Sequence, residues 1–214
     1  KMALGFVNEN SGDGSAIVPI LKYETRGGYI IKVDRHQDEG GTWVKDETEL
    51  EYPVKVAMDL ENIKVGWLGF VGGAPDFHLV NIGEPMPARP SADHNQGFQV
   101  KLCNKELGLR EFSSGAKTVT VPFNDLHNAF EAQKADNAGK VPVIEFTGSE
   151  RYKVNTPNGE LTFKKPVMVI SGWVDRPATL DGAAAPQEPA PTVSAPAMAA
   201  VATSAAPPAG SDLF

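Results

Sequence analysis

The sequence predicts a mainly β body with a single helix, followed by a tail of different character. Three observations support this prediction. Short segments with apolar residues at every second position recur through the first 177 residues, separated by Gly, Pro or Asn. One later segment instead repeats its apolar residues at helical spacing. Beyond residue 177 the composition changes abruptly to Ala, Pro, Thr and Ser.

Period-two alternation identifies the expected strands. In residues 28–35, for example, Tyr29, Ile31 and Val33 alternate with polar residues. The dipeptide Asn-Gly at 158–159 predicts a tight hairpin between two such segments. The acidic run 46–51 is expected to be a solvated loop instead. The expected strands cover residues 17–23, 28–35, 54–60, 62–71, 76–83, 97–103, 117–123, 141–148, 151–154, 161–165 and 167–174.

One helix is expected at about 123–138. Phe123, Leu126 and Phe130 recur at helical spacing, and Gly139 suits a C-terminal cap. A many-stranded body with one helix in its second half fits a small barrel better than a two-sheet sandwich. The expected architecture is therefore an OB-fold-like Greek-key barrel, which is a partly open barrel. Extra hairpins are required, because more than five strands are expected.

Domain organisation and charge limit the classes of function. Residues 1–177 are the expected domain. Residues 178–214 are the expected flexible tail, because prolines interrupt regular structure there and large apolar residues are scarce. The net charge of −7 argues against a uniformly basic nucleic-acid-binding surface. Three acidic residues follow the last basic residue, Arg176, and without them the chain has 20 basic and 24 acidic residues. A local basic face is compatible with this balance.

No catalytic, cofactor or metal motif is recognisable. Phosphate-loop, dinucleotide-binding and serine-nucleophile motifs are absent from the sequence. Cys103 is the single cysteine, which fits a reducing cytoplasm and predicts a buried strand residue. No apolar run is long enough to span a membrane, so no membrane partner is expected. The histidines lack metal-ligand spacing, and the pair Asp76 and His78 offers at most a weak metal site on one strand face.

Basic residues interleave with aromatic residues on the strand-like segments. Aromatic rings stack on unpaired bases, at about 1–3 kcal/mol per base, while Lys and Arg contact phosphates. This pattern predicts non-catalytic, sequence-tolerant binding of single-stranded DNA. Since side chains alternate along a strand, we expect Tyr152 to face away from Arg151 and Lys153. The candidate DNA-binding residues are Lys22, Tyr23, Tyr29, Lys32, Arg35, Lys101, Arg151, Tyr152, Lys153 and Lys164.

The chain ends in Asp212, Leu213 and Phe214, after the Pro/Ala-rich segment. A terminal Phe offers a ring for an apolar pocket and a free carboxylate for a basic neighbour. This arrangement resembles the single-stranded-DNA-binding proteins of bacteria and their phages, and phage or prophage versions in particular. The resemblance implies an OB-fold body that protects single strands during replication, recombination and repair. It also implies that the tip docks partner proteins of these pathways in the bacterial cytoplasm. The tip departs from the family in carrying one acidic residue rather than a cluster.

Two other classes of function stay open. A structural or assembly protein of a phage could use a β-barrel with a Pro/Ala-rich tail and would need no basic groove. An enzyme or sugar-binding module could have a site that converges only in three dimensions. Self-association is likewise left open. The discriminating observation is a surface that combines exposed rings with Lys and Arg side chains.

Overall fold

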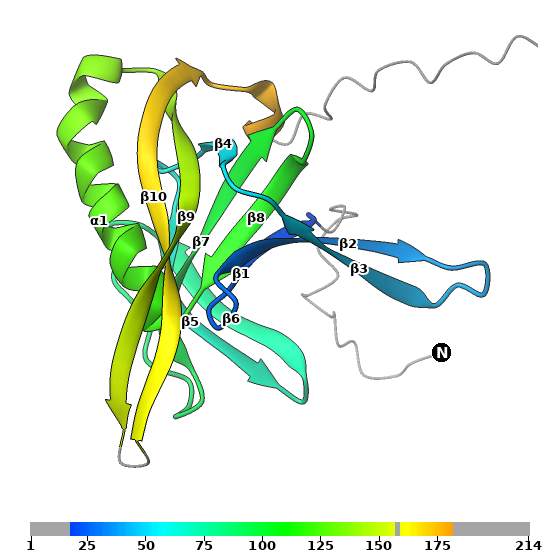
Figure 1. Ribbon diagram of the computed structural model, residues 1–214. Coiled ribbons are helices and arrows are strands. Elements are labelled where there is room, and N and C mark those ends of the chain that lie inside the picture. Colours follow the sequence, from blue (N-terminus) through cyan, green and yellow to red (C-terminus); the bar gives the residue numbers. More distant parts are fainter. Residues whose placement is uncertain (1–17, 157–158, 182–214) are drawn as a thin grey trace, which may run out of the picture.

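A computed structural model describes residues 18–156 and 159–181 (Figure 1). Within these residues the fold is mainly β with one α-helix, which confirms the predicted fold class. The helical elements are α1 (Lys117–Gln133) and the short 3-10 turns η1 (Lys134–Asn137) and η2 (Ala178–Asp181). The strands are β1 (Ile20–Glu24), β2 (Tyr29–Gln37), β3 (Trp43–Leu50), β4 (Val54–Met58), β5 (Lys64–Val71), β6 (Ala74–Asn81), β7 (Asn95–Asn104), β8 (Gly108–Ser114), β9 (Lys140–Thr156) and β10 (Gly159–Asp175).

The strands form one ten-stranded sheet in the order β10-β9-β4-β7-β8-β1-β2-β3, with β5 pairing to both β6 and β7. All pairs are antiparallel except β1 with β8. Three hairpins project from the centre of the molecule, namely β2–β3, β5–β6 and the distal half of β9–β10 (Figure 1). The antiparallel pairing of β9 with β10 also confirms the predicted hairpin around residues 158–159.

The connectivity is OB-like, but the sheet is not closed into a barrel. As expected for such a fold, β4 pairs with both β7 and β9, and α1 lies between β8 and β9. The strand beside β8 is β1 rather than the last strand, β10. A backbone hydrogen bond from Lys164 N–H to Thr25 O, 2.6 Å long, joins β10 to the β1–β2 turn. The expected barrel is thus corrected to an open, curled sheet.

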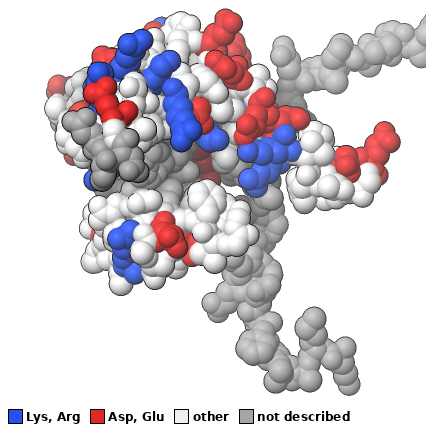
Figure 2. All heavy atoms as spheres, turned by 60° about the horizontal axis from the view of Figure 1, so that its bottom comes forward, with Lys and Arg blue, Asp and Glu red and all other residues white. Residues whose placement is uncertain are grey.

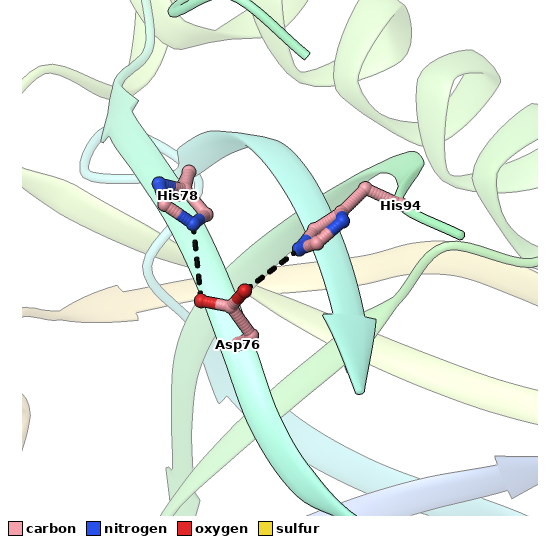
Figure 3. A group of neighbouring side chains, drawn as sticks. All are labelled: Asp76, His78 and His94. Carbon is pink, nitrogen blue, oxygen red and sulfur yellow. Dashed lines mark hydrogen bonds and ion pairs between the residues drawn. The ribbon is translucent and has the colours of Figure 1, made fainter. Parts of the chain in front are cut away.

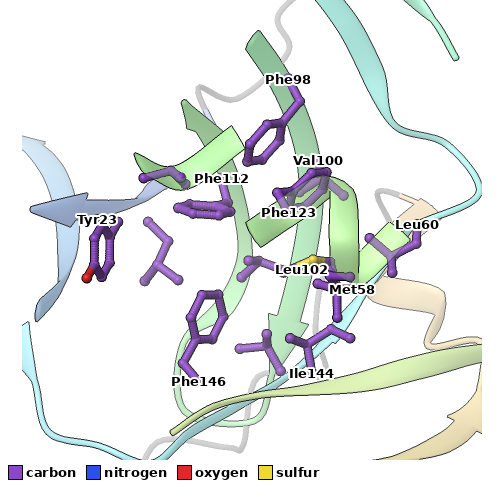
Figure 4. Close-up of a cluster of buried hydrophobic side chains, with 14 of the residues drawn as sticks. Tyr23, Met58, Leu60, Phe98, Val100, Leu102, Phe112, Phe123, Ile144 and Phe146 are labelled. Atoms are coloured by element: carbon purple, nitrogen blue, oxygen red, sulfur yellow. The ribbon is translucent and has the colours of Figure 1, made fainter. Parts of the chain in front are cut away.

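The hydrophobic core lies between α1 and the curled sheet, and it combines aliphatic side chains with a group of packed aromatic rings (Figure 4). Phe123 of α1 stacks on Phe98 of β7, with ring centroids 3.6 Å apart. Phe112 of β8 meets Phe98 and Phe146 edge-on, at 5.5 and 5.9 Å between centroids. Edge-on and stacked pairs of this kind stabilise a core beyond simple burial of area.

The helix begins earlier than predicted, because packing overrides local propensity. Residues 117–123, predicted as a strand from their Val and Thr content, are the first turns of α1. Val119 is fully buried and continues the stripe formed by Phe123, Leu126 and Phe130. The helix ends at Gln133, and η1 then leads to Gly139, whose φ of 77° reverses the chain into β9.

The acidic run 46–51, predicted as a loop, lies mostly in strand β3. The strand pairs with β2 along its whole length, from Trp43 opposite Gln37 to Leu50 opposite Ile30. Most β3 side chains are exposed, although the first half of β2 is buried, so the charged residues of β3 do not prevent the pairing. The sequence lacked an apolar alternation here because the hairpin extends beyond the core.

The domain extends past the predicted boundary at residue 177. In η2, Leu180 is 1% exposed and packs with Ala57, Cys103 and Val141. The boundary is therefore corrected to include Asp181, and the remainder of the predicted tail lies outside the described residues. In the described ranges, no helix is long and apolar enough to cross a membrane.

Cys103 is buried, as predicted, and its burial raises the pKa of the thiol. Because the thiolate is the reactive form, we expect native protein to react with a thiol-specific reagent at neutral pH more than about tenfold more slowly than unfolded protein. A colorimetric thiol assay with and without denaturant checks this. Equal rates would show that the turn η2 does not cover Cys103 in solution.

Candidate nucleic-acid interface

The β9–β10 hairpin places three candidate cations on one face. Arg151 lies opposite Lys164, and Lys153 lies opposite Thr162, with an unbroken register across this part of the hairpin. Directly opposed residues share a face of a sheet, and residues two apart on one strand also share it. Arg151, Lys153 and Lys164 therefore line one face, which we call the cationic face.

The β1–β2 turn lies against this face. Besides the backbone bond to Thr25, the Lys164 Nζ atom donates a hydrogen bond to the Gly27 carbonyl at 2.7 Å. Tyr52 fixes the turn further, since its hydroxyl donates to the carbonyl of Gly28 at 3.0 Å. Two segments far apart in the sequence thus meet at Lys164. Arg26 is exposed in this turn, between the two residues whose carbonyls Lys164 contacts.

Several of these cations are free of carboxylates. Lys153 forms an ion pair with Glu160 at 2.9 Å. Arg26 and Arg151 form no ion pair with any described residue, and both are exposed. A guanidinium without a carboxylate partner is available to an incoming phosphate, which it can contact through two N–H groups.

The candidates on β1 and β2 divide between two faces. Lys22 and Arg35 are exposed and share one face, because Lys22 lies opposite Ile31, and Arg35 follows at an even spacing. Lys32 projects to the other face and pairs with Asp34 at 3.1 Å. Asp34 also accepts a hydrogen bond from buried Arg110 at 2.6 Å.

Partial burial of Asp34 opposes ionisation, but its bonds to Arg110 and Lys32 hold the pKa of this carboxyl below its usual value. Asp34 is therefore ionised at neutral pH, and Lys32 is engaged with it. Lys32 is consequently less available to a ligand than Lys22 or Arg35.

Two of the three aromatic candidates, Tyr23 and Tyr152, do not lie on the cationic face. Tyr23 is 7% exposed and belongs to the core, so it cannot stack on a base in this structure. Tyr29 is half-buried and its ring lies over Gly27. Tyr152 is 42% exposed and lies opposite Phe163, on the reverse face of the hairpin from Arg151. The expectation that Tyr152 faces away from its basic neighbours therefore agrees with the register.

Lys101 lies apart from the other candidates. It is exposed on β7 and borders a hollow that contains none of them. Three acidic and three basic residues border this hollow, and Arg176 pairs with two of the carboxylates, Asp59 and Asp181. The charged residues around the hollow are Asp59, Lys64, Lys101, Glu111, Arg176 and Asp181.

Two exposed residues were not among the candidate DNA-binding residues. Arg26 lies in the β1–β2 turn rather than on a strand. Phe70, 67% exposed, lies near the tip of the β5–β6 hairpin, with its ring 6.3 Å from that of Phe77. The signal for Phe70 was present, because Gly72 and Gly73 predict a turn, and a ring beside a hairpin tip is far from the core.

Charge is mixed over the surface as a whole. Figure 2 shows Lys and Arg side chains interspersed with Asp and Glu rather than one continuous basic area. The described residues also contain one group of potential metal ligands, formed by Asp76, His78 and His94. The candidate docking tip, Asp212 to Phe214, lies outside the described residues, and its role stays a prediction.

Comparison with family models, with curated proteins and with solved structures gives no match to this chain.

Proposed function

We propose that the protein binds single-stranded DNA, without catalysis, along the cationic face of the β9–β10 hairpin and the adjoining β1–β2 turn. The observation that carries this proposal is that the turn containing Arg26 meets the hairpin face containing Arg151 and Lys164, although the two segments are remote in sequence. The OB-like connectivity supports it, since folds of this kind commonly bind nucleic acids on a strand face between projecting loops.

Single strands suit this surface better than duplex. Reading duplex DNA through the major groove requires a helix or ribbon that enters it. The helix α1 buries its apolar stripe in the core, and its exposed residues include Asp125 and Glu131. A single strand can instead follow the hairpin, with phosphates on the cationic face and unpaired bases reaching an exposed ring such as Tyr152 or Phe70.

The acidic balance of the chain sets the expected strength of binding. A net charge of −7 gives no long-range attraction for DNA, and Glu150 and Glu160 lie on the same hairpin. Affinity is therefore expected to depend on a few local contacts. It should also fall steeply as the salt concentration rises, because the release of counterions from the DNA then contributes less to binding.

The test is a double substitution, Arg26→Ala with Arg151→Ala, measured by fluorescence anisotropy against an oligo(dT) strand and a duplex of equal length. Each lost phosphate contact is expected to weaken binding to oligo(dT) about 3- to 10-fold. The two losses together should also make the plot of log affinity against log salt concentration shallower, by about 1.4 in slope. Both residues are exposed, so thermal stability should be unchanged.

The matched control is Lys105→Ala with Lys140→Ala, which removes the same charge elsewhere. Lys105 lies in the β7–β8 turn. Lys140 lies opposite Asp175 in the strand register, at the far end of the β9–β10 hairpin. The control should bind as the unaltered protein does. Equal affinity for duplex, or equal weakening by both double variants, would contradict the proposed interface.

A second candidate function is a structural or assembly role without nucleic-acid binding. Exposed apolar side chains on projecting hairpins favour it, namely Phe70, Val71 and Trp43, which are 67%, 60% and 60% exposed. The same experiment separates the two functions. An assembly protein would show no saturable binding to oligo(dT) and a concentration-dependent molar mass in solution.

A further inference from the structure

A compact group of metal-ligand side chains lies at the β5–β6 hairpin, with Asp76 and His78 on β6 and His94 directly before β7 (Figure 3). The Nε2 atom of His78 is 3.0 Å from one carboxylate oxygen of Asp76, and the Nε2 atom of His94 is 3.1 Å from the other. The potential ligand atoms of all three residues lie within 4.8 Å of one another. Sequence reasoning had paired Asp76 with His78 alone, because His94 is 18 residues beyond Asp76.

The sheet itself brings His94 to this pair. Strand β5 lies between β6 and β7, so Gly69 is opposite Asp76 on one side, while Leu68 is opposite Asn95 on the other. His94, which precedes Asn95, therefore comes beside Gly69. A Cβ atom on Gly69 would lie 2.6 and 2.7 Å from Cδ2 and Nε2 of the His94 ring. The absence of a side chain at Gly69 is what lets this ring reach across β5 to Asp76.

The ring of His94 is fixed in the way that is usual for a metal-binding histidine. The residue is 1% exposed, and its Nδ1 atom is 2.8 Å from the hydroxyl of Ser91. A partner on one ring nitrogen fixes the ring and directs the other nitrogen to the metal, which is the usual arrangement around ligating histidines. Arg89 also donates a hydrogen bond to the His94 carbonyl at 2.9 Å, so the backbone is fixed as well.

Two imidazole nitrogens and one carboxylate oxygen select the class of ion. Calcium and magnesium prefer oxygen ligands throughout, whereas zinc takes this mixed set with water at the fourth position. The side chains of Asp76 and His78 are 37% and 45% exposed, so water can reach the open position. We propose that Asp76, His78 and His94 form a binding site for a divalent transition-metal ion, Zn²⁺ being the best match.

The role of such an ion would be to fasten the segment between β6 and β7 to the β5–β6 hairpin. This segment is already joined to β5, since the indole N–H of Trp67 donates to the Pro87 carbonyl at 2.8 Å. The guanidinium of Arg89 lies over the Trp67 ring at 5.3 Å. A metal at His94 would add a bond at the end of the segment, directly before β7.

The test uses the full, tag-free chain, treated with a chelator and then titrated with ZnCl₂ in competition with a chromophoric chelator. We expect one equivalent of Zn²⁺ to bind and to raise the melting temperature. His78→Ala and Asp76→Asn should each weaken this binding by at least about 10-fold. Both side chains are partly exposed, so both variants should fold, which circular dichroism checks.

The matched control is His36→Ala. His36 forms an exposed pair with Asp46 at 3.1 Å on the β2–β3 hairpin, without a third ligand. Zinc binding by this variant should equal that of the unaltered chain. Cobalt substitution should give the visible absorption bands of a four-coordinate site. Failure of the unaltered chain to bind Zn²⁺ saturably, or equal weakening by His36→Ala and His78→Ala, would overturn the proposal and leave a hydrogen-bonded cluster.

Discussion

Arg176→Ala is expected to lower the free energy of unfolding by about 3 kcal/mol, because it leaves a buried carboxylate without its partner. Asp59, 3% exposed, accepts hydrogen bonds from both terminal nitrogens of Arg176, at 3.0 and 2.6 Å, and from the Asn62 amide. The loss falls at the lower end of the range for buried pairs, since the Arg176 side chain is 28% exposed. Denaturant titration followed by circular dichroism measures it.

The pH dependence of stability provides a second test of the pair formed by Arg176 and Asp59. Burial alone would raise the pKa of Asp59, but the bonds from Arg176 and Asn62 hold the pKa of this carboxyl below its usual value. The stability contributed by the pair is therefore present above about pH 4 and is lost as pH falls through the lowered pKa. In Arg176→Ala the unpaired carboxyl protonates more readily, so the difference from the unaltered protein should narrow in acid.

The control for Arg176→Ala is Lys153→Ala, which removes an exposed ion pair with Glu160. Exposed pairs contribute about 0–1 kcal/mol, so this variant should be nearly as stable as the unaltered protein. A loss for Arg176→Ala no larger than that of the control, or a difference that widens in acid, would show that the buried pair does not stabilise the fold.

Phe112→Ala is expected to lower the free energy of unfolding by about 3–5 kcal/mol, through lost burial and the cavity it leaves. Phe112 is 1% exposed and meets the rings of Phe98 and Phe146, so it connects β8 to both β7 and β9. The same denaturant titration measures the change. Because the neighbouring rings are themselves packed, the core has little freedom to close over the cavity.

Phe70→Ala is the matched control, with the same substitution at a ring that is 67% exposed. It should alter stability by less than about 0.5 kcal/mol. If Phe70 stacks on bases, the control should still lower affinity for oligo(dT). Equal destabilisation by the two substitutions would contradict the assignment of Phe112 to the core.

Part of this architecture could be predicted from local sequence. Alternation of apolar residues identified β2, β5 and β7, because a strand with one buried face must place apolar residues at every second position. The Asn-Gly signal identified the β9–β10 hairpin. This alternation is not required where the chain leaves the core, because neither face of the strand is buried there. The acidic β3 was therefore missed, while the Val and Thr residues that begin α1 were misassigned.

The sequence by itself determined a mainly β fold with one helix and a hairpin on which Arg151 and Lys153 share a face. Both follow from periodicity within a single segment. Tertiary structure alone decided that Tyr23 is buried, that Lys164 meets the β1–β2 turn, and that His94 crosses Gly69 to reach Asp76. The physical reason is that these contacts join segments through strand order and sheet curvature. Strand order and curvature result from packing of the whole chain, so no local pattern encodes them.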